Sequence, residues 1–392
     1  MKALEPYWPD LALNYDDSRD VLNARIGEVA GLGDSVVPVL LEKLTPANGS
    51  GDGGRQLAAN CRRVLERLDP ASFVDALAEL ANGPSPTART EAIRLLGAAQ
   101  NGQAAALLVD LLDATTGDDR RTVLRALRQH RSPVGAAKAA PLLGANERAM
   151  REDVLGYLTA ARAGAVASVV ADALAAERDP KLLPLYVEYF AAATKANDAA
   201  ARALLPLLDR DRLDWQDTRR LVQALASIAP AGHEPTTKRL AALLDDGEPS
   251  SVSVQAAVTM RALGDKQGVT KVRKAIDEQM RKGRRRQEGS LYEHRANLSF
   301  ATEDYAEAFA DFEKVLEFQD SLAMTRRAYV GMMRCDAHRK RTVNLLKLLR
   351  ASGMTIAEIE AVGADDPDFA EALKQDRVRK ELQALAKEQA PK

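Results

Sequence analysis

The chain has 392 residues, of which 46% are apolar and only 4% aromatic, so its buried surface must come mainly from Ala, Leu and Val. Its 55 lysines and arginines nearly balance its 56 aspartates and glutamates, which excludes the uniformly basic surface typical of many nucleic-acid-binding proteins. The charge is uneven only over residues 266–286, where cations are concentrated.

The first segment, residues 1–17, contains Pro6 and Pro9 and predicts an irregular N-terminal lead or cap. Tyr7 and Trp8 are expected to cover the end of the first helix pair, because the terminal unit of a repeat array needs a modified outer face. The segment has no basic stretch followed by an apolar one, and no later stretch approaches about 18 uninterrupted apolar residues. These patterns predict a cytoplasmic protein without a membrane partner.

Helical periodicity begins after residue 18 and is interrupted at 45–54, Thr-Pro-Ala-Asn-Gly-Ser-Gly-Asp-Gly-Gly. Glycine and polar residues of this density predict a flexible loop. No strand precedes it and it lacks a Gly-Lys-Ser/Thr ending, so it is not expected to bind phosphate.

The two cysteines, Cys61 and Cys335, are too few and too far apart in sequence to indicate a disulfide framework. Cys61 lies beside Ala58 and Val64 at helical spacing, which predicts a buried and unreactive thiol.

A short apolar phrase recurs through the middle of the chain. Its closing residues Leu96, Leu127 and Leu158 are spaced by 31 residues, and the series continues at longer intervals to Leu263. Each phrase is followed within the same period by a second apolar phrase, as at Leu112. Two phrases per period predict a repeated pair of helices, so we expect an all-α superhelix in which each pair buries its apolar face against its neighbours.

The segment 86–112 resembles the short bacterial form of the HEAT repeat, with an arginine in the first helix, a Leu-Gly-Ala turn and paired leucines closing the second helix. Arg89, Arg120 and Arg151 recur at the same period and match the arginine of that motif, which is mostly structural in the family. The resemblance implies HEAT-like helical repeats over 18–286. The period is shorter than the roughly 40–47 residues usual for HEAT repeats, so a generic α-hairpin solenoid is the alternative.

A different pattern follows the basic segment. Residues 304–318 resemble the second half of a tetratricopeptide repeat, with matching residues at the motif's apolar positions, Tyr305, Ala308, Phe312 and Leu316. Arg295 and Ser299 stand where this motif has large apolar residues. The resemblance implies that 287–392 forms a small TPR-like helical bundle, made of hairpins and a closing helix, that continues or caps the HEAT-like array.

The sequence indicates no catalytic constellation. The histidines are isolated from one another and from the cysteines at any recognised ligand spacing, so no metal, cofactor or small-molecule ligand is expected: His130, His233, His294 and His338. Acidic pairs such as Asp365-Asp366 lie at breaks between helices, where carboxylates are expected to cap free backbone amides.

HEAT-like folds include DNA glycosylases, which use a tryptophan and aspartate cluster, and some bilin lyases. The best match to such a cluster here is Trp215 with Asp214 and Asp217. At the start of a helix, Trp215 is expected to be a packing residue, so an enzyme of either kind is only a second alternative.

Two groups of cations are candidate contact residues. In the basic segment, apolar residues such as Val269 and Val272 define a buried face, so Lys271, Arg273 and Lys274 are expected on the solvated side of the last HEAT-like helix. The predicted contact residues lie at the end of this segment: Arg281, Lys282, Arg284, Arg285 and Arg286. A solvated helix end, or a joint neutralised by the molecule's own acidic surface, is the competing interpretation.

A second basic face carries Arg121, Arg125 and Arg128, which share one side of a helix, but no continuous basic stripe follows the repeats. We therefore predict a non-enzymatic scaffold or adaptor that binds a protein partner along the groove of the array, beside Arg94, Arg125 and Arg261. The alternative is nucleic-acid binding through the basic segment 266–286.

Overall fold

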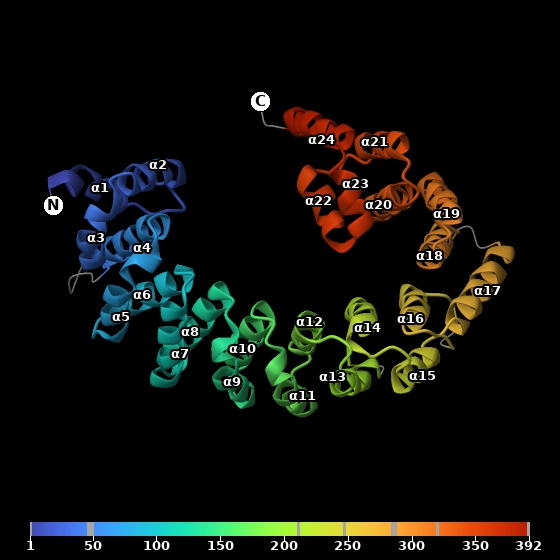
Figure 1. Cartoon of the computed structure of the whole chain (residues 1–392), viewed down its shortest axis with the longest axis horizontal. Helices are drawn as coiled ribbons and strands as arrows, with labels where there is room; N and C mark the ends of the chain where they lie inside the picture. The colour runs from blue at the N-terminus through green and yellow to red at the C-terminus, as the bar shows by residue number, and fades with distance from the viewer. Residues whose placement is uncertain are drawn as a thin grey trace. The chain divides into compact units, whose positions relative to one another are not determined.

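The computed structural model describes residues 2–44, 51–209, 212–245, 248–283, 288–318 and 321–389. Every regular element in these ranges is a helix, which confirms the predicted all-α fold of stacked helical hairpins (Figure 1). The chain divides into two compact units, Met1–Leu207 (unit 1) and Leu208–Lys392 (unit 2). None of the helices in the described ranges combines the length and the apolar character needed to cross a bilayer.

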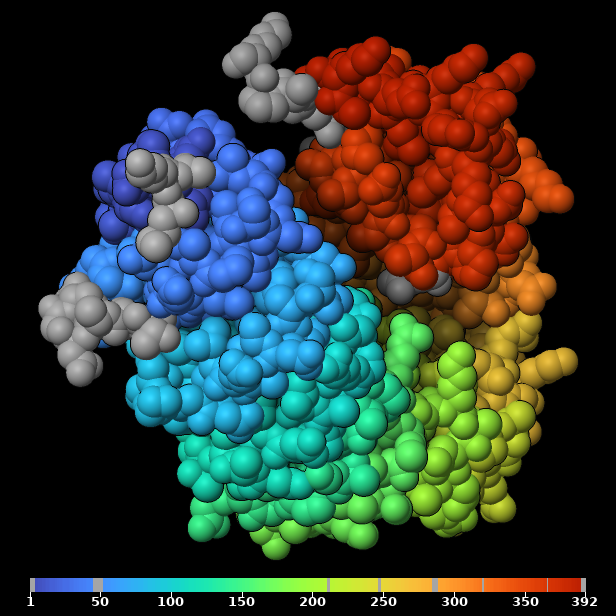
Figure 2. All heavy atoms as spheres, turned by 60° about the vertical axis from the view of Figure 1, so that its left-hand side comes forward, coloured from blue at the N-terminus to red at the C-terminus, as the bar shows by residue number. Residues whose placement is uncertain are grey.

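Unit 1 is a double layer of helices. The first helices of successive hairpins, from α4 to α12, pack in series in one layer, and the second helices from α5 to α13 form the other (Figure 1). Side chains fill the spaces between neighbouring helices (Figure 2). The helices are α1 (Trp8–Leu11), α2 (Arg19–Ala30), α3 (Val37–Lys43), α4 (Gly51–Arg67), α5 (Val74–Asn82), α6 (Pro86–Ala98), α7 (Gly102–Ala114), α8 (Gly117–His130), α9 (Ala136–Ala139), α10 (Arg148–Ala160), α11 (Ala167–Ala176), α12 (Leu183–Ala193) and α13 (Asp198–Leu204).

Unit 2 continues the pattern, with α14, α16, α18 and α20 packed in series. Its helices are α14 (Trp215–Ile228), α15 (Glu234–Ala242), α16 (Ser251–Ala262), α17 (Gln267–Arg281), α18 (Glu288–Ala301), α19 (Tyr305–Phe318), α20 (Leu322–His338), α21 (Thr342–Ala351), α22 (Ile356–Asp365), α23 (Pro367–Leu373) and α24 (Asp376–Gln389). Many helices begin with a polar side chain that accepts a backbone N–H, as predicted at Asp366, which accepts the N–H of Phe369 at 3.0 Å.

The N-terminal lead is more regular than predicted. A 3-10 helix (Lys2–Tyr7) leads directly into α1. Leu4 and Leu11 are buried, and the buried Asn60 amide donates hydrogen bonds of 2.9 and 3.0 Å to the carbonyls of Leu11 and Leu13. The lead is therefore attached to α4 through leucines and an asparagine, whereas Trp8 stays half-exposed under the Lys43 ammonium.

The prediction of a loop at 45–54 is wrong for residues 51–54, because α4 already begins at Gly51. Asp52 lies in the first turn, where its charge favours the helix dipole, and it pairs with Arg55 at 2.5 Å. Residues 45–50 lie outside the described residues.

The repeated arginines make different contacts. Arg89 donates to the Gly83 carbonyl that precedes its own helix and to Asp119 of the next hairpin, at 3.0 and 2.8 Å. Arg151 likewise binds the Ala145 carbonyl and Glu177. Arg120 differs, since its buried Nε has no hydrogen-bond partner among the described residues. Arg89 thus joins its hairpin to the next one, whereas Arg151 joins the segment that precedes α10 to the end of α11 in its own hairpin.

A buried tyrosine closes the turn of the preceding hairpin in unit 1. The Tyr157 hydroxyl donates to the Ser132 carbonyl at 2.8 Å and accepts the Gly135 N–H at 3.1 Å. We expect Tyr157→Phe to lower the free energy of unfolding by about 1–3 kcal/mol, because both backbone groups lose their partner. Tyr186→Phe is the matched control, since its equally buried hydroxyl has no partner among the described residues. Equal urea midpoints for the two variants would contradict this role.

The predicted change of repeat type at 286/287 lies inside unit 2, and an apolar core runs across it. This core joins α16, α17 and α18 through Val254, Val272, Ile276 and Leu291, among others. The division of the chain into HEAT-like and TPR-like parts stays a prediction.

A polar network accompanies this core. Arg273 was expected to be solvated, but it is half-buried and donates to Glu307 and to the Ser299 hydroxyl. Arg295 forms two hydrogen bonds with Asp311, of 2.7 and 2.8 Å. The two residues that depart from the tetratricopeptide motif, Arg295 and Ser299, are therefore the ones that link α17, α18 and α19.

Both cysteines are fully buried, and burial raises the pKa of each thiol to about 12. The prediction of an unreactive buried Cys61 is confirmed in this respect, because a thiol with this pKa is protonated at neutral pH.

Asp336 is a fully buried carboxyl group whose two oxygens have no hydrogen-bond partner among the described residues. Burial raises its pKa, against the weaker opposing effect of Arg339 and Arg341. The pKa of Asp336 is therefore higher in the folded protein than in the unfolded chain. Its protonated form contributes its full stability at pH values below the unfolded-state pKa. This contribution is lost as the pH rises through the folded-state pKa, because the buried carboxyl group then ionises.

We expect Asp336→Asn to be more stable than the native chain at pH 7 by about 1–2 kcal/mol, and the difference to vanish near pH 4. Thermal unfolding of both proteins across this range measures it. If the stability difference between the variant and the native chain were the same at pH 7 and pH 4, burial of the ionised carboxylate would not destabilise the native protein.

Candidate functional site

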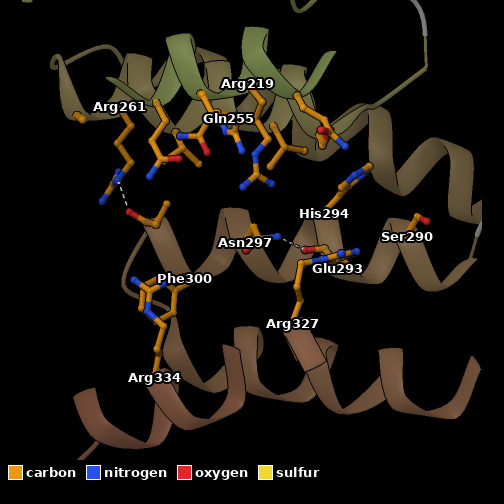
Figure 3. A pocket seen from close by; sticks show the side chains of 18 of the residues that line it. Arg219, Gln255, Arg261, Ser290, Glu293, His294, Asn297, Phe300, Arg327 and Arg334 are labelled. Atoms are coloured by element: carbon orange, nitrogen blue, oxygen red, sulfur yellow. Dashed lines mark hydrogen bonds and ion pairs between the residues drawn. The ribbon is translucent and has the colours of Figure 1, made fainter. Parts of the chain in front are cut away.

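A recess with a volume of about 1010 Å³ lies in unit 2. We call it the unit 2 pocket. Side chains from α14 and α16 line one side, and side chains from α18 and α20 line the other (Figure 3). Its cations are all arginines, and they outnumber the lining carboxylates: Arg219, Arg220, Arg261, Arg327 and Arg334, against Glu293 and Glu303.

Four of these arginines have partners within the protein. Arg220 pairs with Asp217 at 3.0 Å, and Arg261 donates to the Ala301 carbonyl at 2.9 Å. Arg327 binds both oxygens of Glu293, at 2.5 and 3.1 Å. Arg334 donates to Asp366 at 2.6 Å and lies over the Phe300 ring at 4.4 Å.

Arg219 is the exception, because it forms no ion pair or side-chain hydrogen bond with any residue that the structure describes. It is exposed on α14 and reaches toward α18 (Figure 3). A guanidinium in this position has its donors available to a ligand.

Trp215 was predicted to be a packing residue, and this is wrong: it is 60% exposed at the start of α14 and lines the unit 2 pocket. The helix is instead capped by Asp214, which accepts the Asp217 N–H at 2.8 Å, while Asp217 pairs with Arg220. Neither carboxylate lines the pocket, so the unit 2 pocket contains the tryptophan but not the two aspartates of the cluster that the sequence suggested.

The lining also contains neutral polar side chains, and most of these are amides: Gln216, Gln223, Gln255 and Asn297. Each amide offers both a donor and an acceptor, as a peptide group requires. The Asn297 amide donates to the Glu293 carbonyl at 2.9 Å, which fixes its orientation on α18 (Figure 3).

His294 borders the same space. Its Nδ1 is buried without a hydrogen-bond partner among the described residues, and burial lowers the pKa of the imidazole, with Glu293 opposing the shift. The ring is therefore neutral at pH 7, and the positive charge of the pocket comes from guanidinium groups alone.

The predicted groove residues have different environments. Arg94 pairs with Glu91 at 2.8 Å on α6, and Arg125 pairs with Asp153 at 3.0 Å on neighbouring helices of unit 1. Arg261 lines the unit 2 pocket. Arg94 and Arg125 therefore belong to a different unit from Arg261, and each of the three has an internal partner.

The basic segment is partly neutralised by the protein itself. Lys271 pairs with Asp245 and Arg273 with Glu307. Arg281 and Lys282 are exposed, and Arg281 donates to the Asp277 carbonyl of its own helix at 3.2 Å. Arg284, Arg285 and Arg286 lie outside the described residues, so the predicted contact surface at 281–286 stays a prediction.

Three metal-ligand side chains meet beside α20, although the sequence gave no signal for them. The ring nitrogens of His338 lie 3.4 Å from Asp366 and 3.2 Å from Asp368. The Arg334 guanidinium binds the same Asp366 oxygen at 2.6 Å, and a cation in that position disfavours a bound metal ion. This cluster fits an internal ion-pair network better than a metal site.

No protein-family model matches the chain, and no curated protein matches its sequence. Among solved structures, it is similar to an engineered protein at 17% identity and a TM-score of 0.41, over 86% of this chain and 98% of the other. It is similar to the complex of CpcE and CpcF of phycocyanin lyase from Nostoc sp. at 15% identity and a TM-score of 0.34, over 61% and 92%.

A third similarity is to a mutant of Kap121p, at 14% identity and a TM-score of 0.38, over 89% of this chain. The chain spans 45% of the length of that protein. At these identities no residue role is transferred from any of the three.

Proposed function

We propose that the chain is a non-enzymatic, cytoplasmic protein-binding scaffold, and that the unit 2 pocket binds an acidic, extended segment of a partner protein. One observation carries this proposal: the unpaired guanidinium of Arg219 lies beside the exposed Trp215 in a recess of about 1010 Å³. An unpaired cation and an exposed tryptophan are features of binding surfaces rather than of packing.

The lining supports a peptide of this chemistry. Amide side chains pair with the N–H and C=O groups of an extended backbone, guanidinium groups bind carboxylates, and Trp215 offers a flat apolar surface for a side chain of the segment. Because Glu293 is neutralised by Arg327, the pocket keeps an excess of positive charge. An acidic segment is therefore favoured over a basic one.

The resemblances to tetratricopeptide and bacterial HEAT repeats are part of the same proposal. We assign α18 and α19 to a TPR-like hairpin that supplies one side of the pocket through α18, and the preceding helices of unit 2 to bacterial-type HEAT-like repeats that supply the other side.

Fluorescence anisotropy with pools of labelled acidic and lysine-rich decapeptides tests the proposal. We expect the acidic pool to bind at least tenfold more tightly than the basic pool. A labelled DNA duplex, titrated at two salt concentrations, is the control for the nucleic-acid alternative. Tighter binding of DNA with a steep salt dependence, or equal binding of both peptide pools, would contradict the assignment.

A further inference from the structure

A second recess, of about 830 Å³, lies in unit 1 at the C-terminal ends of α8 and α10. It is lined by four exposed arginines and by no carboxylate, the other lining residues being polar or small. We call the four side chains the arginine cluster: Arg125, Arg128, Arg131 and Arg162.

Three members of the cluster lack the internal partners that other arginines of unit 1 have. Arg121 and Arg125 share Asp153 at 2.9 and 3.0 Å, which accounts for two of the three arginines of the basic face seen in the sequence. Among the described residues, the side chains of Arg128, Arg131 and Arg162 form no ion pair and no hydrogen bond.

Arginine near a helix C-terminus can have a structural role by binding the last carbonyls. None of the three unpaired guanidiniums forms such a bond to a described carbonyl. Their positions are therefore not explained by helix capping.

The backbone at two of these positions is unfavourable for arginine. Arg131 directly follows α8 and Arg162 lies two residues after α10, with φ of 59° and 48°, in the left-handed region. Glycine adopts this conformation without strain and does so after α16, at Gly264 with φ 102°. Ala196 shares this conformation, so the backbone alone does not mark a site; what distinguishes Arg131 and Arg162 is that their guanidinium groups line one recess.

Neighbouring glycine leaves room for the third side chain. A Cβ added at Gly156 of α10 would lie 3.0 Å from Nη1 and 3.3 Å from Cζ of Arg128. The guanidinium of Arg128 thus lies directly over the α10 backbone, next to the end of the helix that carries Arg162.

We propose that the arginine cluster binds a phosphorylated side chain presented by a segment of a partner protein. A phosphomonoester carries a charge of about −1.5 to −2 at pH 7 and three acceptor oxygens, so it matches three unpaired guanidinium groups better than a carboxylate, which has one charge and two oxygens. The lining apart from the arginines is polar or small, with Gln129, Thr159, Ala160 and Ala192, and contains no large apolar side chain that would hold a lipid chain. The site is in unit 1 and does not depend on the unit 2 pocket.

The left-handed backbone provides a sharp test. Arg131→Gly/Arg162→Gly removes two cations while placing glycine where it is favoured, so the variant is expected to melt at the same or a higher temperature. Ala196→Gly is the matched control, because Ala196 has φ 48° without a charge. The probes are a labelled pool of phosphoserine decapeptides, the same pool without phosphate, and a labelled single-stranded DNA.

We expect the native chain and Ala196→Gly to bind the phosphorylated pool at least tenfold more tightly than the unphosphorylated one, and the double variant to lose this preference. Equal binding of both pools by the native chain, or unchanged binding by a folded double variant, would overturn the proposal. A double variant that melts at a lower temperature would indicate a structural role for the arginines and would also overturn it. Loss of DNA binding without any preference for phosphopeptides would assign the cluster to nucleic acid instead.

Discussion

Gly331→Ala is expected to lower the free energy of unfolding by about 2–3 kcal/mol, although alanine favours a helix over glycine by about 1 kcal/mol. A Cβ at this position of α20 would lie 2.4 Å from the Phe312 ring of α19. The ring is only 4% exposed and is enclosed by the core of unit 2, so it cannot move aside without disturbing other side chains. Urea unfolding followed by circular dichroism measures the loss.

The control for this prediction is Gly363→Ala on α22. A Cβ there meets only the flexible Leu373 side chain, at 3.2 Å from Cδ1, and the Ala370 atoms at longer range. We expect this substitution to change stability by less than about 1 kcal/mol. If the Gly331→Ala variant were as stable as the Gly363→Ala variant, this result would contradict the close contact between α19 and α20 at Gly331.

Arg295→Leu is expected to destabilise the protein by about 3 kcal/mol, even though it restores the apolar residue of the tetratricopeptide motif. The side chain of Asp311 is 6% exposed and receives two hydrogen bonds from Arg295, of 2.7 and 2.8 Å. Removal of the guanidinium leaves a buried carboxylate without its main partner.

The double variant Arg295→Leu/Asp311→Leu separates the contribution of the ion pair from the contribution of side-chain packing. We expect it to recover most of the lost stability, because two apolar side chains of similar size leave no buried charge. Urea midpoints of the two single variants and the double variant give the coupling energy. A double variant as unstable as Arg295→Leu would show that shape, rather than charge pairing, fixes Arg295.

The helical repeat was predictable from the sequence because it depends on apolar periodicity, which local spacing records directly. The closing leucines Leu96, Leu127 and Leu158 are all buried, and they belong to the first helices α6, α8 and α10. The N-terminal lead and residues 51–54 were less predictable, since proline and glycine there signal a break although neighbouring contacts favour a helix.

The candidate sites depend on contacts between hairpins, which the sequence does not reveal. Its place at a helix start predicted that Trp215 is packed, and only the folded structure shows that it is exposed and lines the unit 2 pocket. The basic face of Arg121, Arg125 and Arg128 was visible, but the partner carboxylate Asp153 and the added Arg162 come from the next hairpin. Charge spacing along one helix could not separate paired from unpaired arginines.

The unit 2 pocket is the basis of the proposed function, and Trp215 is a direct reporter of its occupancy. Trp8 and Trp215 are the two tryptophans of the chain, so Trp8→Phe leaves Trp215 as the single tryptophan, which can be excited selectively over the eight tyrosines. The measurement is its fluorescence during titration with the acidic decapeptide pool, with and without Arg219→Glu. We expect a saturable change in emission, and at least tenfold weaker binding, about 1.4 kcal/mol, after the charge reversal. Emission that does not respond to the peptides, or binding that Arg219→Glu leaves unchanged, would contradict the assignment of this pocket as the partner-binding site.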